Sequence, residues 1–210
     1  NNKGYNLFMI AASTSNAEVI TFLYEKFQNE IQTNVQKKNN NGDDVFTKAA
    51  DNPNVKVITF LYYKFKDQID INLQNNESCT AFMIAANNPN VKVIAFLYEK
   101  FKDQININLT NKSCETVFMI AANNPNVEII KYLCHKFQAQ INVYLKNKIG
   151  DTIFMIAANN ENVEIISFLY EKFKDQINFN LTNKNRETVF MKAAYNPNVD
   201  VITFLYEKLQ

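Results

Sequence analysis

A short motif, Phe-(Met/Thr)-x-Ala-Ala, recurs six times along the chain and constrains the fold more than any other feature. Its Phe stands at positions 8, 46, 82, 118, 154 and 190, so the copies are separated once by 38 residues and then four times by 36. Self-similarity at a fixed period of this length is typical of a solenoid, in which each unit packs against its neighbours. We therefore predict one elongated domain over residues 1–210. Its repeats are predicted at about 1–40, 41–76, 77–112, 113–148, 149–184 and 185–210.

Each repeat predicts a helix, a turn, a second helix and then an extended arm. A good N-cap residue stands two positions before the Phe in every copy, and an Asn precedes every second helix. All four prolines lie in one phase of the repeat, where they end the first helix. Period-2 alternation, as in Ile69, Ile71 and Leu73, predicts an extended arm that ends in a hairpin-like turn. A tetratricopeptide-like stack is the competing architecture, but it would leave only short turns between long helices.

The repeat resembles the ankyrin repeat, which is a turn and two antiparallel helices built around Thr-Pro-Leu-His-x-Ala. The corresponding strings are Thr-Val-Phe-Met-Ile-Ala-Ala at 116–122 and Thr-Ile-Phe-Met-Ile-Ala-Ala at 152–158, followed by second helices such as 126–133. The resemblance implies an all-α fold, an α-solenoid of stacked helix-turn-helix repeats with hairpin-like connecting arms. It also implies protein–protein interaction through the concave face formed by the inner helices and the hairpin tips.

The chain departs from the family pattern in three ways. The motif Pro becomes Val, Ala or Ile, and the motif His becomes Met or Thr. The repeat has 36 residues instead of the 33 of the family, with the extra three in Phe-Lys-Asp-Gln-Ile at 101–105. Because three residues make nearly one helical turn, we expect a longer outer helix.

Bulk composition excludes several classes of function. With 22 basic and 21 acidic residues the net charge is +1, which lacks the basic excess of a nucleic-acid-binding protein. No apolar run approaches 18 residues, so we expect no membrane span. The three cysteines, 79, 114 and 134, have no paired spacing and favour a reducing, cytoplasmic location. If the chain comes from a parasite or an intracellular pathogen, that location includes a host cell.

The sequence contains no recognisable arrangement of catalytic residues, so we expect a non-enzymatic protein without cofactor or metal. His135 follows Cys134 directly, and adjacent residues on a helix do not face one another. We therefore interpret this pair as a packing Cys and a surface His. There is no spaced His/Cys set for zinc, and a chain with three glycines has no phosphate-binding loop.

Two rows of residues are candidates for binding a partner. The tip position before the first N-cap holds Tyr5, Asp43, Cys79, Glu115, Asp151 and Glu187, and three residues earlier it holds Asn2, Asn40, Asn76, Lys112, Lys148 and Lys184. On the first helix, the positions on either side of Ala-Ala supply Lys48, Asp51, Asn123, Asn159, Lys192 and Tyr195. The functional interpretation is a charge-patterned ridge and a mixed strip that select a complementary partner. The alternatives are solvated hairpins whose charges offset one another, core isoleucines, and asparagines that merely end a helix.

The sequence thus indicates a protein-binding module whose partner it does not name. A spacer or positioning arm for a separate domain is the alternative, and an enzyme is the third. The last repeat ends at Leu209-Gln210 with no polar outer face. Since solenoid ends need polar caps, we expect either that the natural protein continues or that a partner covers this end.

Overall fold

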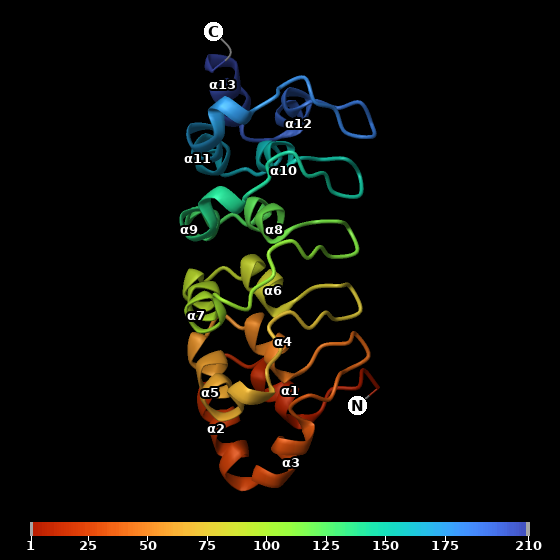
Figure 1. Ribbon diagram of the computed structural model, residues 1–210, viewed down its shortest axis with the longest axis vertical. Coiled ribbons are helices and arrows are strands. Elements are labelled where there is room, and N and C mark those ends of the chain that lie inside the picture. Colours follow the sequence, from red (N-terminus) through yellow and green to blue (C-terminus); the bar gives the residue numbers. More distant parts are fainter. Residues whose placement is uncertain (1, 209–210) are drawn as a thin grey trace. The chain divides into compact units, whose positions relative to one another are not determined.

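The computed structural model describes residues 2–208 of the chain, in two compact units, Asn1–Ile107 and Asn108–Gln210. We call these unit 1 and unit 2 (Figure 1). The boundary falls in the arm that follows helix α7 (Val91–Phe101). The organisation of all six repeats as one domain stays a prediction.

Both units are built from helix pairs, and the residues that the structure describes include no strand. Unit 1 contains α1 (Leu7–Ala12), α2 (Ala17–Lys26), α3 (Gln28–Asn34), α4 (Val45–Ala50), α5 (Val55–Phe65), the 3-10 turn η1 (Lys66–Gln68), α6 (Ala81–Asn87) and α7. Unit 2 contains α8 (Val117–Asn123), α9 (Val127–Phe137), η2 (Gln138–Gln140), α10 (Ile153–Ala158), α11 (Val163–Phe173), η3 (Lys174–Gln176), α12 (Val189–Tyr195) and α13 (Val199–Glu207). The predicted all-α class is confirmed.

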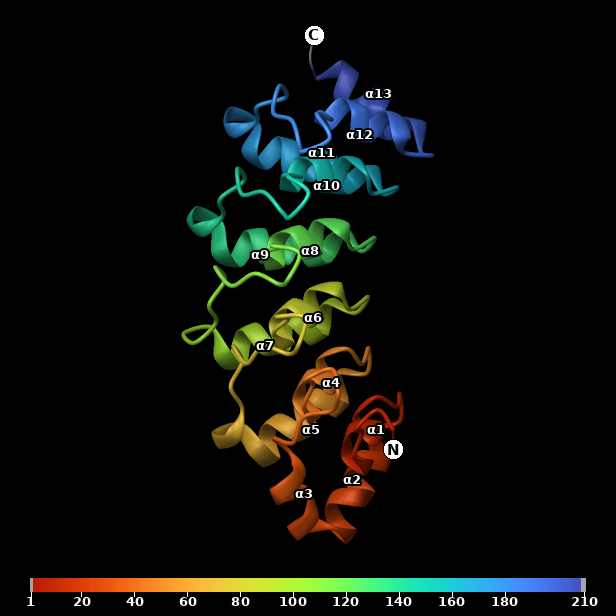
Figure 2. The same ribbon diagram turned by 90° about the vertical axis from the view of Figure 1, so that its right-hand side faces the viewer.

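Within each unit the helices stack in two rows, which is the predicted solenoid arrangement. In unit 2 the inner helix α10 packs on α8 and α12, and the outer helix α11 packs on α9 and α13. In unit 1, α4 packs on α1 and α6, and α5 packs on α2 and α7. Figures 1 and 2 both show α8, α10 and α12 lying one above another. The motif Phe and Ala residues pack between the helices, as at Phe82 (3% exposed) and Ala85 (0%).

The predicted caps position these helices. The Asn before each outer helix accepts a hydrogen bond from the backbone two residues on, as Asn90 does from Lys92 at 3.0 Å. Five of the six inner helices are capped by the side chain two positions before the Phe, and Thr152 is the exception. Local capping chemistry therefore sets where both rows begin.

Buried asparagines tie each repeat to the one before it. Asn88 is 2% exposed; its Oδ1 accepts from the backbone of Asn90 at 2.9 Å, and its Nδ2 donates to the carbonyl of Ala50 at 3.0 Å. The equivalent residues that make such cross-repeat bonds are Asn52, Asn160 and Asn196. The sequence predicts a helix end at this position, and the structure adds a second role. Only a side chain with both an acceptor and donors performs both.

The outer helices are not lengthened in the way that the repeat length predicts. Helix α5 ends at Phe65, which is buried, and the extra residues form the 3-10 turn η1. The tighter turn lets the chain reverse, so that Ile71 of the arm reaches the core at 1% exposure. The first repeat differs from the others, because helix α3 replaces part of its arm.

Candidate partner-binding surface

Each arm ends in a hairpin-like tip that one asparagine holds together. In unit 1, Asn75 Oδ1 accepts from the backbone of Glu77 at 3.0 Å and of Cys79 at 2.9 Å, and the Asn75 N–H donates to the Cys79 carbonyl at 3.0 Å. The same pattern is made by Asn39, Asn111, Asn147 and Asn183. The side chains of these five asparagines, which occupy the same position in the repeat, thus hold the tips together in place of the backbone ladder of a β-hairpin.

The tips also bond to one another within each unit. In unit 1 the backbone N–H of Asn76 donates to the Asn41 carbonyl at 2.9 Å. In unit 2 the N–H of Lys148 donates to the Ser113 carbonyl at 2.7 Å, and that of Lys184 donates to Ile149 at 3.0 Å. The side of each unit made by its inner helices and tips, called the inner face below, therefore has a fixed backbone.

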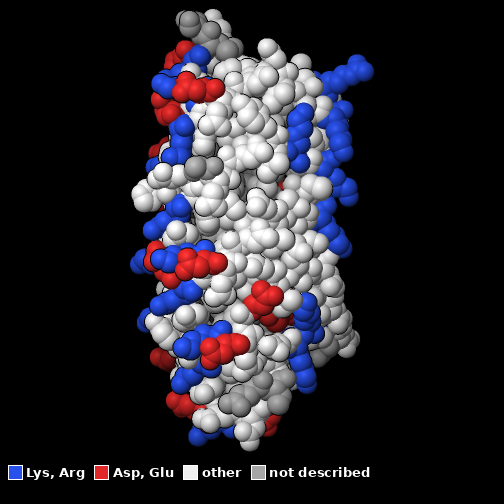
Figure 3. Space-filling view, in the orientation of Figure 1, with Lys and Arg blue, Asp and Glu red and all other residues white. Residues whose placement is uncertain are grey.

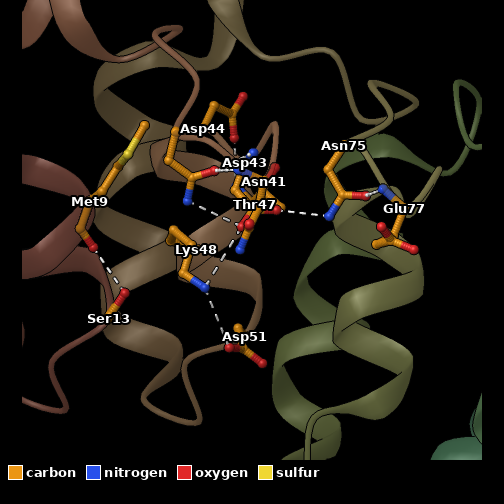
Figure 4. A network of polar contacts seen from close by, with 11 residues as sticks. Met9, Ser13, Asn41, Asp43, Asp44, Thr47, Lys48, Asp51, Asn75 and Glu77 are labelled. Carbon is orange, nitrogen blue, oxygen red and sulfur yellow. Dashed lines mark hydrogen bonds and ion pairs between the residues drawn. The ribbon is translucent and has the colours of Figure 1, made fainter. Parts of the chain in front are cut away.

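The acid of the second repeat turns inward instead of facing solvent (Figure 4). Asp43 is 6% exposed and accepts from Asn75 Nδ2 at 2.8 Å and from Asn39 Nδ2 at 3.3 Å. Lys48 of α4 lies 4.0 Å from Asp43 and 3.8 Å from Asp51. The Lys48 ammonium also lies 5.8 Å from the centre of the Tyr5 ring, a cation–π distance.

The fifth and sixth repeats of unit 2 make a tighter version of this cluster. Lys192 of α12 lies 2.9 Å from Asp151 and 3.6 Å from Glu187. Asn183 Nδ2 donates to both acids, at 2.7 Å each. Asp151 is 4% exposed, so its charge is both buried and neutralised. The Asn183 amide, with help from the Lys192 charge, lowers the pKa of Glu187.

The predicted ridge of exposed acids is therefore wrong for Asp43 and Asp151, which are buried. Glu115 is half-buried and accepts from Asn111 Nδ2 at 2.8 Å. The tip acids serve as acceptors for the asparagine amides that hold the hairpins, and in repeats 2, 5 and 6 they also pair with a lysine from an inner helix. Sequence reasoning missed the burial of Asp43 and Asp151 because the donors Asn75 and Asn183 lie 32 residues away, in the next tip. The available signal was the Asn repeated in one phase of the tips.

Several of the predicted residues are left open to solvent. Asp51, Asn123, Asn159 and Tyr195 are exposed, Tyr195 by 72%. In unit 2 a depression of about 220 Å³ brings five predicted residues together: Glu115, Asn123, Asp151, Asn159 and Lys192. Ile156, from the predicted mixed strip of the first helices, also lines it, together with Asn147 and Ile149, which the sequence analysis did not select for binding.

The depression combines apolar and hydrogen-bonding groups. Ile149 at the tip is 49% exposed, and Ile156 of α10 is 7% exposed. The side-chain amides of Asn123 and Asn159 have no hydrogen-bond partner among the described residues. Such groups can pair with a peptide backbone, while Ile149 can contact an apolar side chain.

The residues considered for chemistry are placed as the structural interpretation predicts. Cys134 is buried, and burial raises the pKa of its thiol to about 12, so it stays protonated at neutral pH. His135 is exposed. Within residues 2–208, no cluster of three or more His, Cys, Asp or Glu side chains is arranged to hold a metal ion. None of the described helices has the length and apolar character needed to cross a membrane.

Comparisons with known proteins identify the repeat. A family profile described as ankyrin repeats in three copies matches residues 49–145 and 137–210. A search of curated protein sequences gave no match. The fold is similar to a chain in the solved structure of the predatory endopeptidase Bd0816 from Bdellovibrio bacteriovorus in complex with immunity protein Bd3460. That match has a TM-score of 0.75 and 22% sequence identity over 98% of this chain and 100% of the other.

Proposed function

Because the chain belongs to the ankyrin repeat family, we propose that it is a non-enzymatic module that binds a protein partner through the inner face of its repeats. The observation that carries this proposal is the depression in unit 2, where five residues selected from the sequence meet. Its open amides and the exposed Ile149 are suited to an extended segment of another protein.

The inner face is also suited to binding because it is formed before the partner arrives. Every tip is held by its asparagine, and Lys192 is fixed by two acids at 2.9 and 3.6 Å. A surface that is already ordered loses little conformational entropy when it binds. Asp151, Glu187 and Lys192 thus act by holding the shape, while Asn123, Asn159 and Tyr195 make the contacts.

The solved structure with the similar fold supports the same class of function. Its title describes an endopeptidase in complex with an immunity protein, which is an assembly of two proteins. For the present chain we propose only the class of partner, a protein.

Site-specific photocrosslinking tests this proposal. A photoreactive phenylalanine analogue replaces Asn123 or Asn159 on the inner face, and in matched controls it replaces Lys136 or Lys174 on the outer side of the same unit. We expect the inner-face probes to crosslink one protein in an extract of the source cells, and the outer probes to leave it free.

The crosslinked protein is then purified and titrated against the chain by calorimetry. We expect Asn123→Ala and Asn159→Ala together to weaken binding by about tenfold or more, since each loses hydrogen bonds to the partner. The proposal fails if crosslinks form only from the outer positions, or if the double variant binds as the wild type does.

A further inference from the structure

The tips of unit 2 carry a row of basic side chains, although the chain as a whole is nearly neutral. The tip segments 110–114, 146–150 and 182–186 contain five basic residues and no acid. All five are exposed, and we call them the basic strip: Lys112, Lys146, Lys148, Lys184 and Arg186. In the upper part of Figure 3, which shows unit 2, Lys and Arg gather on the right edge, whereas both signs mix on the left edge over the outer helices.

The acids beside the strip have their own partners. Asp151 and Glu187 are bound by Lys192 and Asn183, and Glu115 accepts from Asn111. Lys148, Lys184 and Arg186 have no ion pair among the described residues. Lys146 donates to the Thr182 carbonyl at 2.8 Å, which leaves its positive charge in place. Asp151 is buried and Glu115 and Glu187 are half-buried, so the five basic side chains are the exposed charges of these tip segments.

The fold does not need lysine at these positions. In unit 1 the equivalent residues are asparagines, and their side chains bond the tips together: Asn40 Nδ2 donates to the Asn2 carbonyl at 3.0 Å and Asn76 Nδ2 to the Asn40 carbonyl at 2.9 Å. Lys148 and Lys184 keep only the backbone bond to the preceding tip. Lysine at these positions therefore lacks the side-chain hydrogen bond that asparagine makes to the preceding tip, and it places a positive charge at the surface.

We propose that the basic strip docks an acidic segment of the partner protein, beside the depression. This inference rests on the proposed function and deepens it by naming the partner's chemistry. Opposite charges on the two surfaces steer the encounter and fix the register, and like-charged partners are rejected. The strip adjoins Ile149 and, in the depression, the open amides of Asn123 and Asn159, which fit a peptide carrying an acidic and an apolar side chain. Within unit 2 the strip offers no exposed aromatic platform for nucleobases on the tip segments.

The test compares two triple variants of the full chain that remove the same charge. The strip variant is Lys112→Asn/Lys148→Asn/Lys184→Asn, which introduces the residue that unit 1 uses at these positions. The control is Lys66→Asn/Lys102→Asn/Lys174→Asn, which changes exposed lysines after the outer helices. Circular dichroism checks that both variants fold. The probe is a short fluorescein-labelled polyglutamate peptide, and binding is measured by fluorescence anisotropy.

We expect the wild type and the control to bind the peptide, and the strip variant to bind it at least about tenfold more weakly. Raising the salt from about 50 to about 300 mM should weaken wild-type binding, because exposed charges are screened. The inference is overturned if the wild type does not bind, if both variants lose affinity equally, or if an oligonucleotide of equal charge binds more tightly than the peptide.

These results separate the two proposals. If Asn123 and Asn159 crosslink a protein but polyglutamate does not bind, the proposed protein-binding function is supported and the proposal of an acidic partner segment is overturned. Binding of polyglutamate through the strip without any crosslinked protein would leave a polyanion-binding surface and remove the partner site in the depression.

Discussion

The tips of unit 1 and unit 2 share one backbone design and use it differently. At equivalent positions, unit 1 has Asn2, Asn40 and Asn76, and unit 2 has Lys112, Lys148 and Lys184, which are exposed. The side-chain amides of Asn40 and Asn76 each donate to the carbonyl of the equivalent residue in the preceding tip. The asparagines strengthen the stack and add no charge at these positions. The lysines weaken the stack slightly and charge the surface. Since both satisfy the fold, the choice between them is open to selection by a partner.

The two units also differ in their lysine clamps, the clusters in which Lys48 or Lys192 lies between two acids. Lys48 of unit 1 has Asp43 at 4.0 Å and the exposed Asp51 at 3.8 Å, so two acids share it loosely. Lys192 of unit 2 has Asp151 at 2.9 Å and Glu187 at 3.6 Å, in a more enclosed setting. The loss of one acid should therefore destabilise the cluster in unit 2 more than the cluster in unit 1.

Removal of the buried acid should have the largest effect. We expect Asp151→Ala to destabilise the protein by about 3 kcal/mol, because it leaves Lys192 and Asn183 with a lost partner each. Asp43→Ala should cost less, about 2 kcal/mol, since Lys48 lies 4.0 Å from Asp43 whereas Lys192 lies 2.9 Å from Asp151. Urea unfolding followed by circular dichroism measures both. Equal losses would mean that the two clamps are equivalent and would break the comparison.

A side chain at the glycine of a unit 1 tip should come next. Gly42 has a φ of +78°, and an added Cβ would lie 2.7 Å from the backbone N of Asn76. We expect Gly42→Ala to destabilise by about 2 kcal/mol, from strain at positive φ and from the clash with the next tip. The same unfolding experiment tests this, with Ala at the exposed Asn41 as the control. A loss of only a few tenths of a kcal/mol in unfolding free energy would show that neighbouring tips can move apart at little cost.

The same phase in unit 2 offers a change in the opposite direction. Cys114 holds a φ of +58°, in the region where glycine is favoured. Cys114→Gly should raise stability by about 0.5–1 kcal/mol, because relief of strain outweighs the greater freedom of the unfolded chain. Thermal unfolding measures the gain. A decrease would mean that the Cys114 side chain makes a contact worth more than the strain.

Exchange of one strip lysine for the residue of unit 1 should have a smaller effect. Lys148→Asn restores the chance of a side-chain bond to the preceding tip, as Asn76 makes in unit 1, and we expect a gain of about 0.5 kcal/mol. Lys174→Asn, outside the tips, should leave stability unchanged and serves as the control. If Lys148→Asn destabilises instead, the lysines contribute to folding and the argument for selection by a partner is weakened.

The pH dependence should show the smallest effect. The pKa of Glu187 is lowered in the folded protein by the Asn183 amide and the Lys192 charge. A lowered pKa stabilises the fold above the ordinary pKa of glutamate, about 4.3, and that contribution is lost as the pH falls through the folded value. Glu187→Gln should therefore be less stable than the wild type at neutral pH, and the two should converge in acid. If the difference in stability between the variant and the wild type is the same at neutral and acid pH, the Glu187 charge does not account for it.

The sequence by itself determined the repeat, its two helices, their caps and the hairpin-like tips. These depend on residues close together in the chain, such as Asn90 before α7 and Thr116 before α8, so a fixed period exposes them. At 101–105 a longer helix was expected, but α7 ends at Phe101 and a turn follows, because repeat length alone does not distinguish an added helical turn from a reversal of the chain.

Only the tertiary structure decided which charges face the solvent. The partners of Asp43 and Asp151 include Asn75 and Asn183, 32 residues away and in the next tip. Lys192 likewise reaches back to Asp151 across the stack. Whether a carboxylate is buried and neutralised depends on groups brought to it by stacking, and a pattern along one chain records residue types without recording which of them meet. The sequence therefore located the tips, and packing turned an expected row of acids into a surface on which lysines remain.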